Sequence, residues 1–533
     1  MQIFHQRSLF VLKIISRKIK MENKNVVESR FSDSGYIFSM IGSAVGFANI
    51  LSFSARCYRN GGGAFLIPFV LAMIVIGIPV LCLEGLVGQY FQSPLVSAYG
   101  RVSGKSGKFF AWLAVIACAT IGAFYIVLTA WSVIYTYFAA TLAIPEDTGV
   151  FFQQAFLRDS GNIANLGEFS FLIFSATVLI SVFTWFVLVR KIQDGIESIC
   201  SLFMPLLSIL TILFSLIVCF LPGAFQGFYY YLYPDFSKLW NFDLWREVFG
   251  HVFFSFSLGL GIVVGYSRYT RKETNIARAM FCVAMGDFFI SLIAGFAIFG
   301  CIGFMSHSSG IAIGDIVRSD STFEMGFVVF PMILKSFSPH FSAIIGCLFF
   351  FCVFIAGITG VFSIVESVAG NIEIEFIKTR RTAVAIAIVG MTLFSIPFCM
   401  GNGIYILAAM EPMVLGNNML IGGIAEIFVF MYLTKHIRDH NSWIRSGGGR
   451  SYSFYSIRYF VPIILFSILA GSLFSEICNG FHINEMLRWG WFISACGLSM
   501  ILANKGVVSD SLEEKTPNLK KDASLHPQLQ SNL

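Results

Sequence analysis

The chain has 533 residues, of which 56% are hydrophobic and only 12% carry a charge. Soluble globular proteins carry about 25% charged residues, so a chain this apolar has too little polar surface for water and is expected to lie in a lipid bilayer. Its net charge of +6 comes from short loops and not from a polar segment interleaved with aromatics, which argues against nucleic-acid binding.

Apolar stretches long enough to cross about 30 Å of hydrocarbon recur along the whole chain. Because these runs are continuous and do not alternate, they predict helices and not barrel strands. We therefore predict an all-α polytopic membrane protein with about 12 transmembrane helices. The predicted spans cover residues 36–60, 64–91, 109–142, 169–190, 196–222, 245–270, 277–305, 336–374, 383–400, 403–434, 459–478 and 485–503.

The loops between these spans alternate in charge. One set is basic, as at Arg268, Arg271 and Lys272, and the alternate set is acidic or balanced, as at Glu146 and Asp147. Positive charge collects on the cytoplasmic side, so both termini are expected in the cytoplasm. The 12 cysteines lie almost all inside spans without paired extracellular spacing, so no disulfide framework is expected.

The two ends of the chain are more polar than the rest. Residues 1–35 are expected to form a cytoplasmic N-terminal segment, in which the apolar run at 9–15 is too short to cross a membrane. Either that run is an amphipathic helix, or translation starts at Met21. Residues 504–533 are expected to form a disordered cytoplasmic tail.

Small and polar residues interrupt the first span in mid-membrane, where residues 42–49 read GSAVGFAN. Such residues weaken a helix, and unwound backbone at that depth is tolerated only where it lines a buried cavity. A close helix–helix contact through the two glycines is the alternative explanation. The sixth span carries a second interruption, because residues 255–261 read SFSLGLG.

Two interrupted spans, five elements apart, indicate two equivalent halves of a transporter with its site between them. Each break frees N–H groups that suit a carboxylate and carbonyl oxygens that suit sodium. The pattern therefore predicts that a zwitterion and cations bind together.

The residues around these breaks resemble the neurotransmitter:sodium symporter family. The resemblance covers about residues 30–505 and rests on the runs at 42–49 (GSAVGFAN), 60–68 (NGGGAFLIP), 77–79 (GIP), 255–261 (SFSLGLG), 326–331 (GFVVFP) and 356–359 (AGIT). The chain is similar to bacterial-type sodium-dependent amino acid transporters, because the large second extracellular loop of animal members is absent. The resemblance implies a leucine-transporter-like fold of two inverted five-helix repeats, 36–222 and 245–434, with two peripheral spans at 459–503.

The family also implies two sodium sites. One would use the carbonyl oxygens of Ala44 and Ser255 with the side chains of Asn49, Ser255 and Asp287. The other would use the carbonyl oxygens of Gly42, Val45 and Ala356 with the hydroxyl of Thr359. Sodium, as one or two ions, is the expected cofactor, and no organic cofactor is expected.

An amino acid would lie between the first, third, sixth and eighth spans, with Tyr125 on its carboxylate. The substrate residues implied by the resemblance are Ala44, Gly46, Phe47, Ala48, Ile121, Tyr125, Phe254, Ser255, Ser257, Leu260 and Ile364. Amine-carrying relatives have an aspartate at the position of Gly46, so the glycine indicates a substrate that brings its own carboxylate. The apolar side chains predict a neutral, hydrophobic or aromatic amino acid, although Ile121, Leu260 and Ile364 would equally serve as plain core.

Several positions depart from the family pattern. The arginine of the outer gate is replaced by Ser52, while its acidic partner is matched by Glu411. Arg56 lies one helical turn beyond Ser52 and either replaces the gate arginine or is a solvated charge of the vestibule. Gly360 stands where a serine often supplies the second sodium site, which removes one oxygen.

The expected function is sodium-coupled symport of an amino acid into the cell by alternating access, across a bacterial inner membrane. No nucleophile–base pair or phosphate loop indicates an enzyme. A proton-coupled carrier using Asp287 and His251, and a receptor-like or channel protein without coupled transport, are the alternatives. The sequence leaves the oligomeric state open.

Chloride is not expected to be required. By the same resemblance, the positions that hold the anion in chloride-dependent relatives are Phe69, His251, Ser255, Asp287 and Ser291. A fixed carboxylate at Asp287 would repel chloride and balance the sodium charge itself. His251 is predicted to hydrogen-bond that carboxylate.

Overall fold

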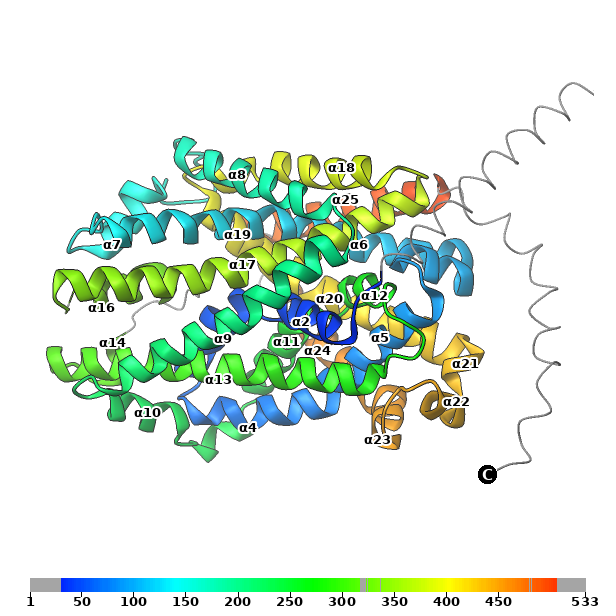
Figure 1. Cartoon of the computed structure of the whole chain (residues 1–533), viewed down its shortest axis with the longest axis horizontal. Helices are drawn as coiled ribbons and strands as arrows, with labels where there is room; N and C mark the ends of the chain where they lie inside the picture. Colours follow the sequence, from blue (N-terminus) through cyan, green and yellow to red (C-terminus); the bar gives the residue numbers. More distant parts are fainter. Residues whose placement is uncertain are drawn as a thin grey trace, which may run out of the picture.

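In the computed structural model the described residues are 30–316, 323, 325–335, 337–478, 480 and 482–505. They form helices and loops and no β-strand. Figure 1 shows the long helices lying side by side along the longest axis of the molecule. Of the predicted end segments, residues 1–29 and 506–533 lie outside the described part of the chain.

The first predicted span is broken, as its sequence indicated. α2 (Asp33–Ala44) ends at Val45, and the chain resumes as η1 (Ala48–Ser52) and α3 (Phe53–Arg59) at an angle of 55°. The remaining helices of the first half are α4 (Gly63–Ala72), η2 (Met73–Gly77), α5 (Ile78–Phe91), α6 (Leu95–Ala140), α8 (Phe171–Leu188), η4 (Gln193–Glu197) and α9 (Ser198–Cys219).

The sixth predicted span is broken as well. α11 (Phe242–Ser255) and α12 (Ile262–Ser267) are separated by non-helical residues 256–261. The other long elements of the second half are α13 (Ile276–Ser309), α17 (Pro339–Glu375), α18 (Arg380–Phe394), η7 (Ile396–Cys399), α19 (Gly403–Glu411), η8 (Pro412–Asn417), α20 (Asn418–Glu426), η9 (Ile427–Leu433), α24 (Val461–Cys478) and α25 (Ile483–Lys505).

Nine helices in the described residues are long and apolar enough to cross a membrane, and the bent first pair makes ten. The halves α11 and α12, and the 15-residue α18, lie at the two remaining predicted spans, which accounts for the predicted number. One predicted boundary was wrong: the third span was placed at 109–142, but α6 begins at Leu95 and continues through a kink at Gly104 (φ 59°). Its basic residues read as loop, yet Lys108 is buried against Glu375.

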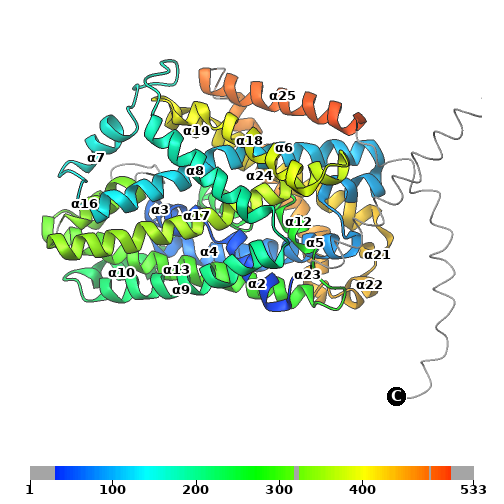
Figure 2. The same cartoon turned by 45° about the horizontal axis from the view of Figure 1, so that its top comes forward.

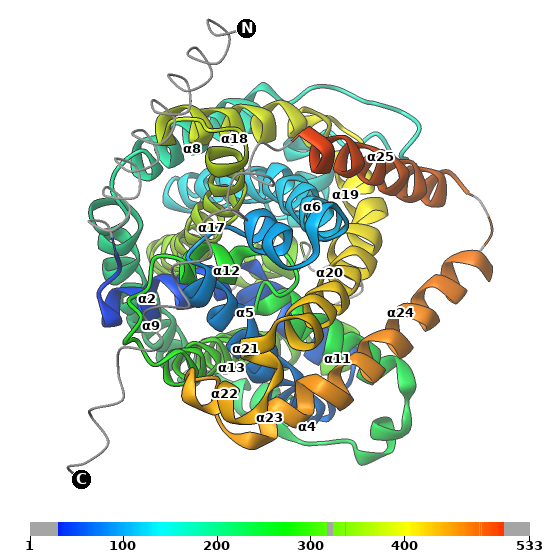
Figure 3. The same ribbon diagram turned by 90° about the vertical axis from the view of Figure 1, so that its right-hand side faces the viewer.

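The broken spans lie in the interior of the bundle. Viewed along the helices, α2, α5 and α12 lie inside a ring of other helices, while α24 and α25 follow its outer edge (Figure 3). Figure 2 shows α25 along the outside of the molecule, and its apolar side chains, such as Ile493, are largely exposed. α5 is buried from Ile78 to Gln89, so the core surrounds the breaks.

Backbone geometry holds the second break in place. Ser257, Gly259 and Gly261 have φ values of 54°, 73° and 73°, a left-handed region that favours glycine. The Gly259 N–H donates to Glu84 Oε1 of α5 (2.8 Å). A Cβ at residue 259 would lie 2.5 Å from the carbonyl oxygen of Met419, so only glycine fits.

Candidate functional site

The first break brings a polar side chain back onto its own backbone. Val45 has extended angles (φ −76°, ψ 111°), which ends α2. The Gly46 N–H donates to Asn49 Oδ1 (2.8 Å), and the Phe47 N–H donates to the Tyr125 hydroxyl of α6 (3.1 Å). The N–H groups that the break frees are thus bound by side chains, as buried backbone groups must be.

The side chains predicted for the first sodium site meet in the core. Asn49 Nδ2 donates to Asp287 Oδ1 (2.6 Å) and to Ser291 Oγ (2.8 Å). Ser255 Oγ donates to Asp287 Oδ1 (2.9 Å) and lies 3.2 Å from Asn49 Nδ2. They come from η1, α11 and α13, and each is at most 1% exposed.

The charge of this cluster is not balanced by a side chain. Among the described residues no Lys or Arg forms an ion pair with Asp287. A buried carboxylate without a cationic partner is costly in mid-membrane. Carboxylate, amide and hydroxyl oxygens are hard ligands, so the cluster has the chemistry of a site for a small hard cation.

The residues predicted for the second sodium site also come together, at the contact of α2 with α17. A Cβ at Gly42 would lie 3.4 Å from the Cβ of Thr359, and a Cβ at Gly46 would lie 4.0 Å from the carbonyl oxygen of Ala356. Thr359 Oγ1 lies 3.0 Å from the Ile355 carbonyl oxygen and 3.2 Å from that of Ala356. Thr359 is the one hydroxyl of the predicted set, since the other ligands are backbone carbonyls.

Tyr125 explains both glycines next to it. A Cβ at Gly46 would collide with the Tyr125 hydroxyl, and a Cβ at Gly360 would lie 2.8 Å from Cε1 of the same ring. An aspartate at residue 46 or a serine at residue 360 therefore does not fit while Tyr125 holds this position. The ring also lies 4.8 Å from that of Phe47, measured between centroids.

A cavity opens beside Tyr125 and extends toward the Glu411 end of α19. Four predicted substrate residues line it: Phe47, Ala48, Tyr125 and Phe254. The other lining residues are Ser52, Phe124, Leu128, Phe323, Leu407, Glu411 and Leu415. Its wall is mainly apolar, with one carboxylate and two hydroxyl groups.

The remaining predicted substrate residues do not line this cavity. Ala44 ends α2, Gly46 lies under the Tyr125 hydroxyl, and Ser255 belongs to the Asp287 cluster. The others lie between α6, α12 and α17 or in the second break: Ile121, Ser257, Leu260 and Ile364.

Sequence reasoning missed several cavity residues. Leu128 follows Tyr125 by one helical turn, and Phe124 is its neighbour, so helical periodicity could have suggested Leu128. Phe323, Leu407 and Leu415 come from distant segments and carry no local signal.

Two further predictions concern charged or titratable side chains. Arg56 Nε donates to Ser52 Oγ (3.2 Å), so Arg56 does lie beside the position of the gate arginine. The hydrogen bond predicted from His251 to Asp287 was wrong: His251 is fully buried and neither ring nitrogen has a partner. Its ring lies among those of Phe53, Phe65 and Phe69, with centroids 5.7, 6.0 and 5.7 Å away.

Two broken helices that face each other across buried oxygen atoms define a class of secondary transporters. Residues 29–150 and 146–509 match the sodium:neurotransmitter symporter family, and the chain belongs to it. It is therefore a multi-pass, sodium-dependent membrane transporter, from a family of carriers and not of enzymes.

Known proteins of this family span most of the chain. An uncharacterized sodium-dependent transporter of Methanocaldococcus jannaschii is 34% identical over 415 residues, 78% of this chain and 84% of the relative. The sodium- and chloride-dependent GABA transporter 2 of Mus musculus is 28% identical over 468 residues, 78% of this chain and 73% of the relative. The crystal structure of MhsT in complex with L-phenylalanine has the same fold, with a TM-score of 0.72 at 24% identity, covering 83% of this chain and 99% of MhsT. The inverted-repeat fold predicted from the sequence is confirmed.

Proposed function

We propose that this chain carries a neutral amino acid with a hydrophobic or aromatic side chain into the cell with sodium, by alternating access and without chloride. The observation that carries the proposal is the buried cluster of Asp287, Asn49, Ser255 and Ser291 beside the first break. A cation there would neutralise the one carboxylate, and its presence would fix both broken helices. Cation binding would thus be coupled to the shape of the site.

One sodium ion would bind the carbonyl oxygens of Ala44 and Ser255 and the side chains of Asn49, Ser255 and Asp287. A second would bind between α2 and α17, on the carbonyl oxygens of Gly42, Val45 and Ala356 and the hydroxyl of Thr359. Gly360 leaves that second site one oxygen poorer, so we assign the tighter binding to the Asp287 site.

The substrate carboxylate would take the place that the Phe47 N–H now fills with the Tyr125 hydroxyl. A carboxylate between them would accept from both groups, which a helix N-terminus favours. The side chain would then extend into the apolar cavity lined by Phe124, Leu128 and Phe254. The phenylalanine in the MhsT structure is in line with such a substrate.

The direction of transport follows from orientation. The basic loops place both termini in the cytoplasm, and the cavity that reaches Glu411 would then open toward the outside. We assign the protein to the cytoplasmic (inner) membrane of a bacterium.

Uptake by proteoliposomes tests this function. With an inward sodium gradient, labelled phenylalanine or leucine should accumulate, and replacing sodium by choline should abolish accumulation. Accumulation driven by a proton gradient without sodium would instead support the proton-coupled alternative. Binding without accumulation would support the non-transporting one.

Tyr125→Phe tests the substrate assignment. Loss of the hydroxyl should weaken amino acid binding by about 1–3 kcal/mol, and decarboxylated analogues should bind poorly to the unaltered protein. Tight binding of the amine analogue would contradict the assignment.

A further inference from the structure

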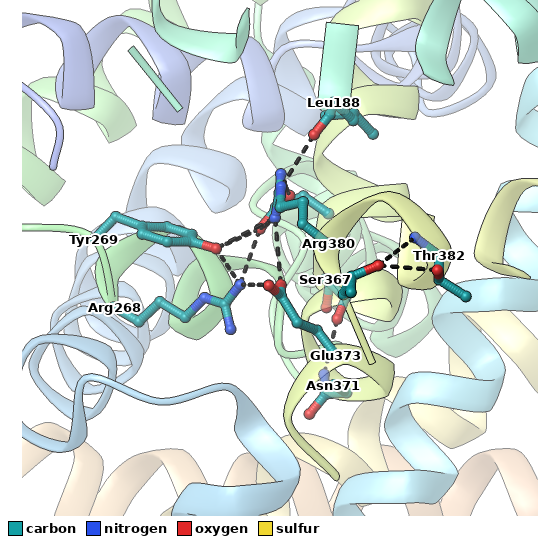
Figure 4. Close-up of polar contacts among 10 residues, drawn as sticks. Leu188, Arg268, Tyr269, Ser367, Asn371, Glu373, Arg380 and Thr382 are labelled. Carbon is teal, nitrogen blue, oxygen red and sulfur yellow. Dashed lines mark hydrogen bonds and ion pairs between the residues drawn. The ribbon is translucent and has the colours of Figure 1, made fainter. Parts of the chain in front are cut away.

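Four charged side chains and one tyrosine close the end of the molecule opposite the cavity. Glu366 of α17, fully buried, accepts from Arg268 Nη2 (3.1 Å), from the Tyr269 hydroxyl (3.0 Å) and from Arg380 Nη1 (3.0 Å). Glu373, two turns further along α17, lies 4.0 Å from Arg268 and 3.7 Å from Arg380. Figure 4 shows both arginines converging on these carboxylates.

The two arginines belong to different parts of the fold. Arg380 begins α18, reaches Glu366 with two nitrogens, and donates from Nε to the carbonyl oxygen of Leu188 at the end of α8 (3.0 Å). Bidentate pairs of this kind hold their geometry strongly. Arg380 therefore joins α8, α17 and α18 to one another.

Arg268 directly follows α12, a six-residue helix cut off from α11 by the second break. α12 is attached to α2, because the hydroxyls of Tyr36 and Ser267 lie 2.6 Å apart and the Phe31 N–H donates to the Tyr269 carbonyl oxygen (3.1 Å). We call α2 and α12 with these contacts the α2–α12 unit. Both of its helices end at a break, so it can move without the rest of either span.

Arg268 joins this unit to α17. Its guanidinium lies against the helix backbone at Gly370, where a Cβ would be 2.7 Å from Nη2 and 3.0 Å from Cζ. The contact to Glu366 is almost completely buried, since Arg268 is only 6% exposed in its side chain. The glycine thus provides the space that the arginine occupies.

The arrangement solves an electrostatic problem of opening. A buried carboxylate that loses its last partner is strongly destabilised. If the α2–α12 unit moves away with Arg268, Glu366 still has both bonds from Arg380, so no buried charge is left alone. Arg268 itself would move toward water, where hydration replaces its lost contacts.

We propose that Arg268 is the releasable charge of this closure: it holds the α2–α12 unit against α17 in the closed state and separates from Glu366 when the pathway opens. The proposal rests on the proposed alternating access. Arg380 is the permanent partner of Glu366 and keeps it neutralised in both states. Arg268 is thus a positioning residue for transport.

A second buried ion pair on α17 provides the matched control. Lys108 Nζ lies 2.7 Å from Glu375 Oε2, with side chains 3% and 0% exposed, and Ser97 Oγ donates to the other oxygen of Glu375 (2.7 Å). This pair joins α6 to α17 and does not touch the α2–α12 unit. Lys108→Gln therefore breaks an equally buried pair without releasing that unit.

A native cysteine can report the movement. Cys200 of α9 is fully buried, and its sulfur would lie 3.4 Å from a Cβ at Gly42 of α2. Withdrawal of the α2–α12 unit would expose it to water and to thiol reagents. Cys301 of α13, also buried, serves as the internal reference for general loosening.

The test measures N-ethylmaleimide labelling of Cys200 by peptide mass spectrometry, with the full-length protein in lipid nanodiscs. In sodium-free buffer Arg268→Gln should label Cys200 about tenfold faster than the unaltered protein, which corresponds to about 1.4 kcal/mol in the open–closed equilibrium. Lys108→Gln should label at the unaltered rate, and Cys301 should not change in Arg268→Gln. Sodium should slow Cys200 labelling of the unaltered protein.

Equal Cys200 rates in Arg268→Gln and the unaltered protein would overturn the proposal, and so would equal acceleration in Lys108→Gln. Should Arg268→Gln fail to fold, Gly370→Ala keeps every charge but displaces the guanidinium and should accelerate labelling in the same direction. An unchanged rate there would equally count against Arg268. Because labelling does not need transport, a failure of sodium-coupled uptake would be seen separately, in the unaltered protein.

Discussion

The two predicted sodium sites differ in what supplies their oxygen atoms. At the Asp287 site four side chains from three helices converge, and one of them carries a full charge. At the Thr359 site the predicted ligands are backbone carbonyls around a break, with one hydroxyl. The first site is therefore defined by side-chain chemistry and the second by backbone shape. Substitutions should change the electrostatics of the first, but only one ligand of the second.

The largest effect is expected from Asp287→Asn. A sodium ion would then be buried without a balancing charge, and breaking a buried pair costs about 3–5 kcal/mol. The sodium concentration for half-maximal uptake should rise by at least about 100-fold, with partial rescue by chloride bound to Ser255 and Ser291. Asp235→Asn, in an exposed loop, is the control. An unchanged sodium dependence in Asp287→Asn would remove the distinction between the two sites.

Asn49→Ala is expected to have the next largest effect. The amide joins Asp287 to the first break through its bonds to the carboxylate (2.6 Å) and to the Gly46 N–H (2.8 Å). A hydrogen bond to a charged group contributes about 1.5–3 kcal/mol, so the sodium requirement should rise by roughly 10- to 100-fold. Sodium titration of uptake measures it. A shift smaller than that of Thr359→Val would reverse the proposed ranking of the sites.

Thr359→Val should have a smaller effect. Valine keeps the shape and removes one oxygen, while the carbonyl ligands remain, so a loss of about 0.5–1.5 kcal/mol is expected. Thr184→Val removes a similar buried hydroxyl, bonded to the Ile180 carbonyl oxygen (2.8 Å), and should leave the sodium titration unchanged. Equal shifts in the two variants would show that Thr359 is only structural.

The smallest effect is expected from removing chloride. Asp287 already supplies the negative charge beside the first site, so replacing chloride by gluconate should leave uptake by the unaltered protein as it was. Initial rates in the two salts provide the measurement. A large loss of uptake would mean that the carboxylate does not balance the cation.

The fold was largely predictable because its signals are local. Hydrophobic length located the spans, and runs of glycine and serine located both breaks. The start of α6 was missed because the signal is not local: Lys108 looks like a loop charge until Glu375, 267 residues later, is placed against it.

The site was predictable only where a local motif carries it. The residues of the two breaks, with Tyr125 and Asp287, match family motifs. The cavity wall at Phe323, Leu407 and Leu415 depends on how distant elements pack, which no periodicity shows. The steric reason for Gly360, namely the ring of Tyr125, likewise became visible only in three dimensions.

The pair of Lys108 and Glu375 has a consequence for biogenesis. While the chain is being synthesised, Lys108 exists long before α17 does, and as an unpaired basic residue next to α6 it helps to orient the early spans. Once α17 has been inserted, Glu375 and Ser97 enclose the same ammonium group in the interior. One lysine thus serves membrane insertion first and tertiary packing afterwards, and the second role becomes available only when three-quarters of the protein has left the ribosome.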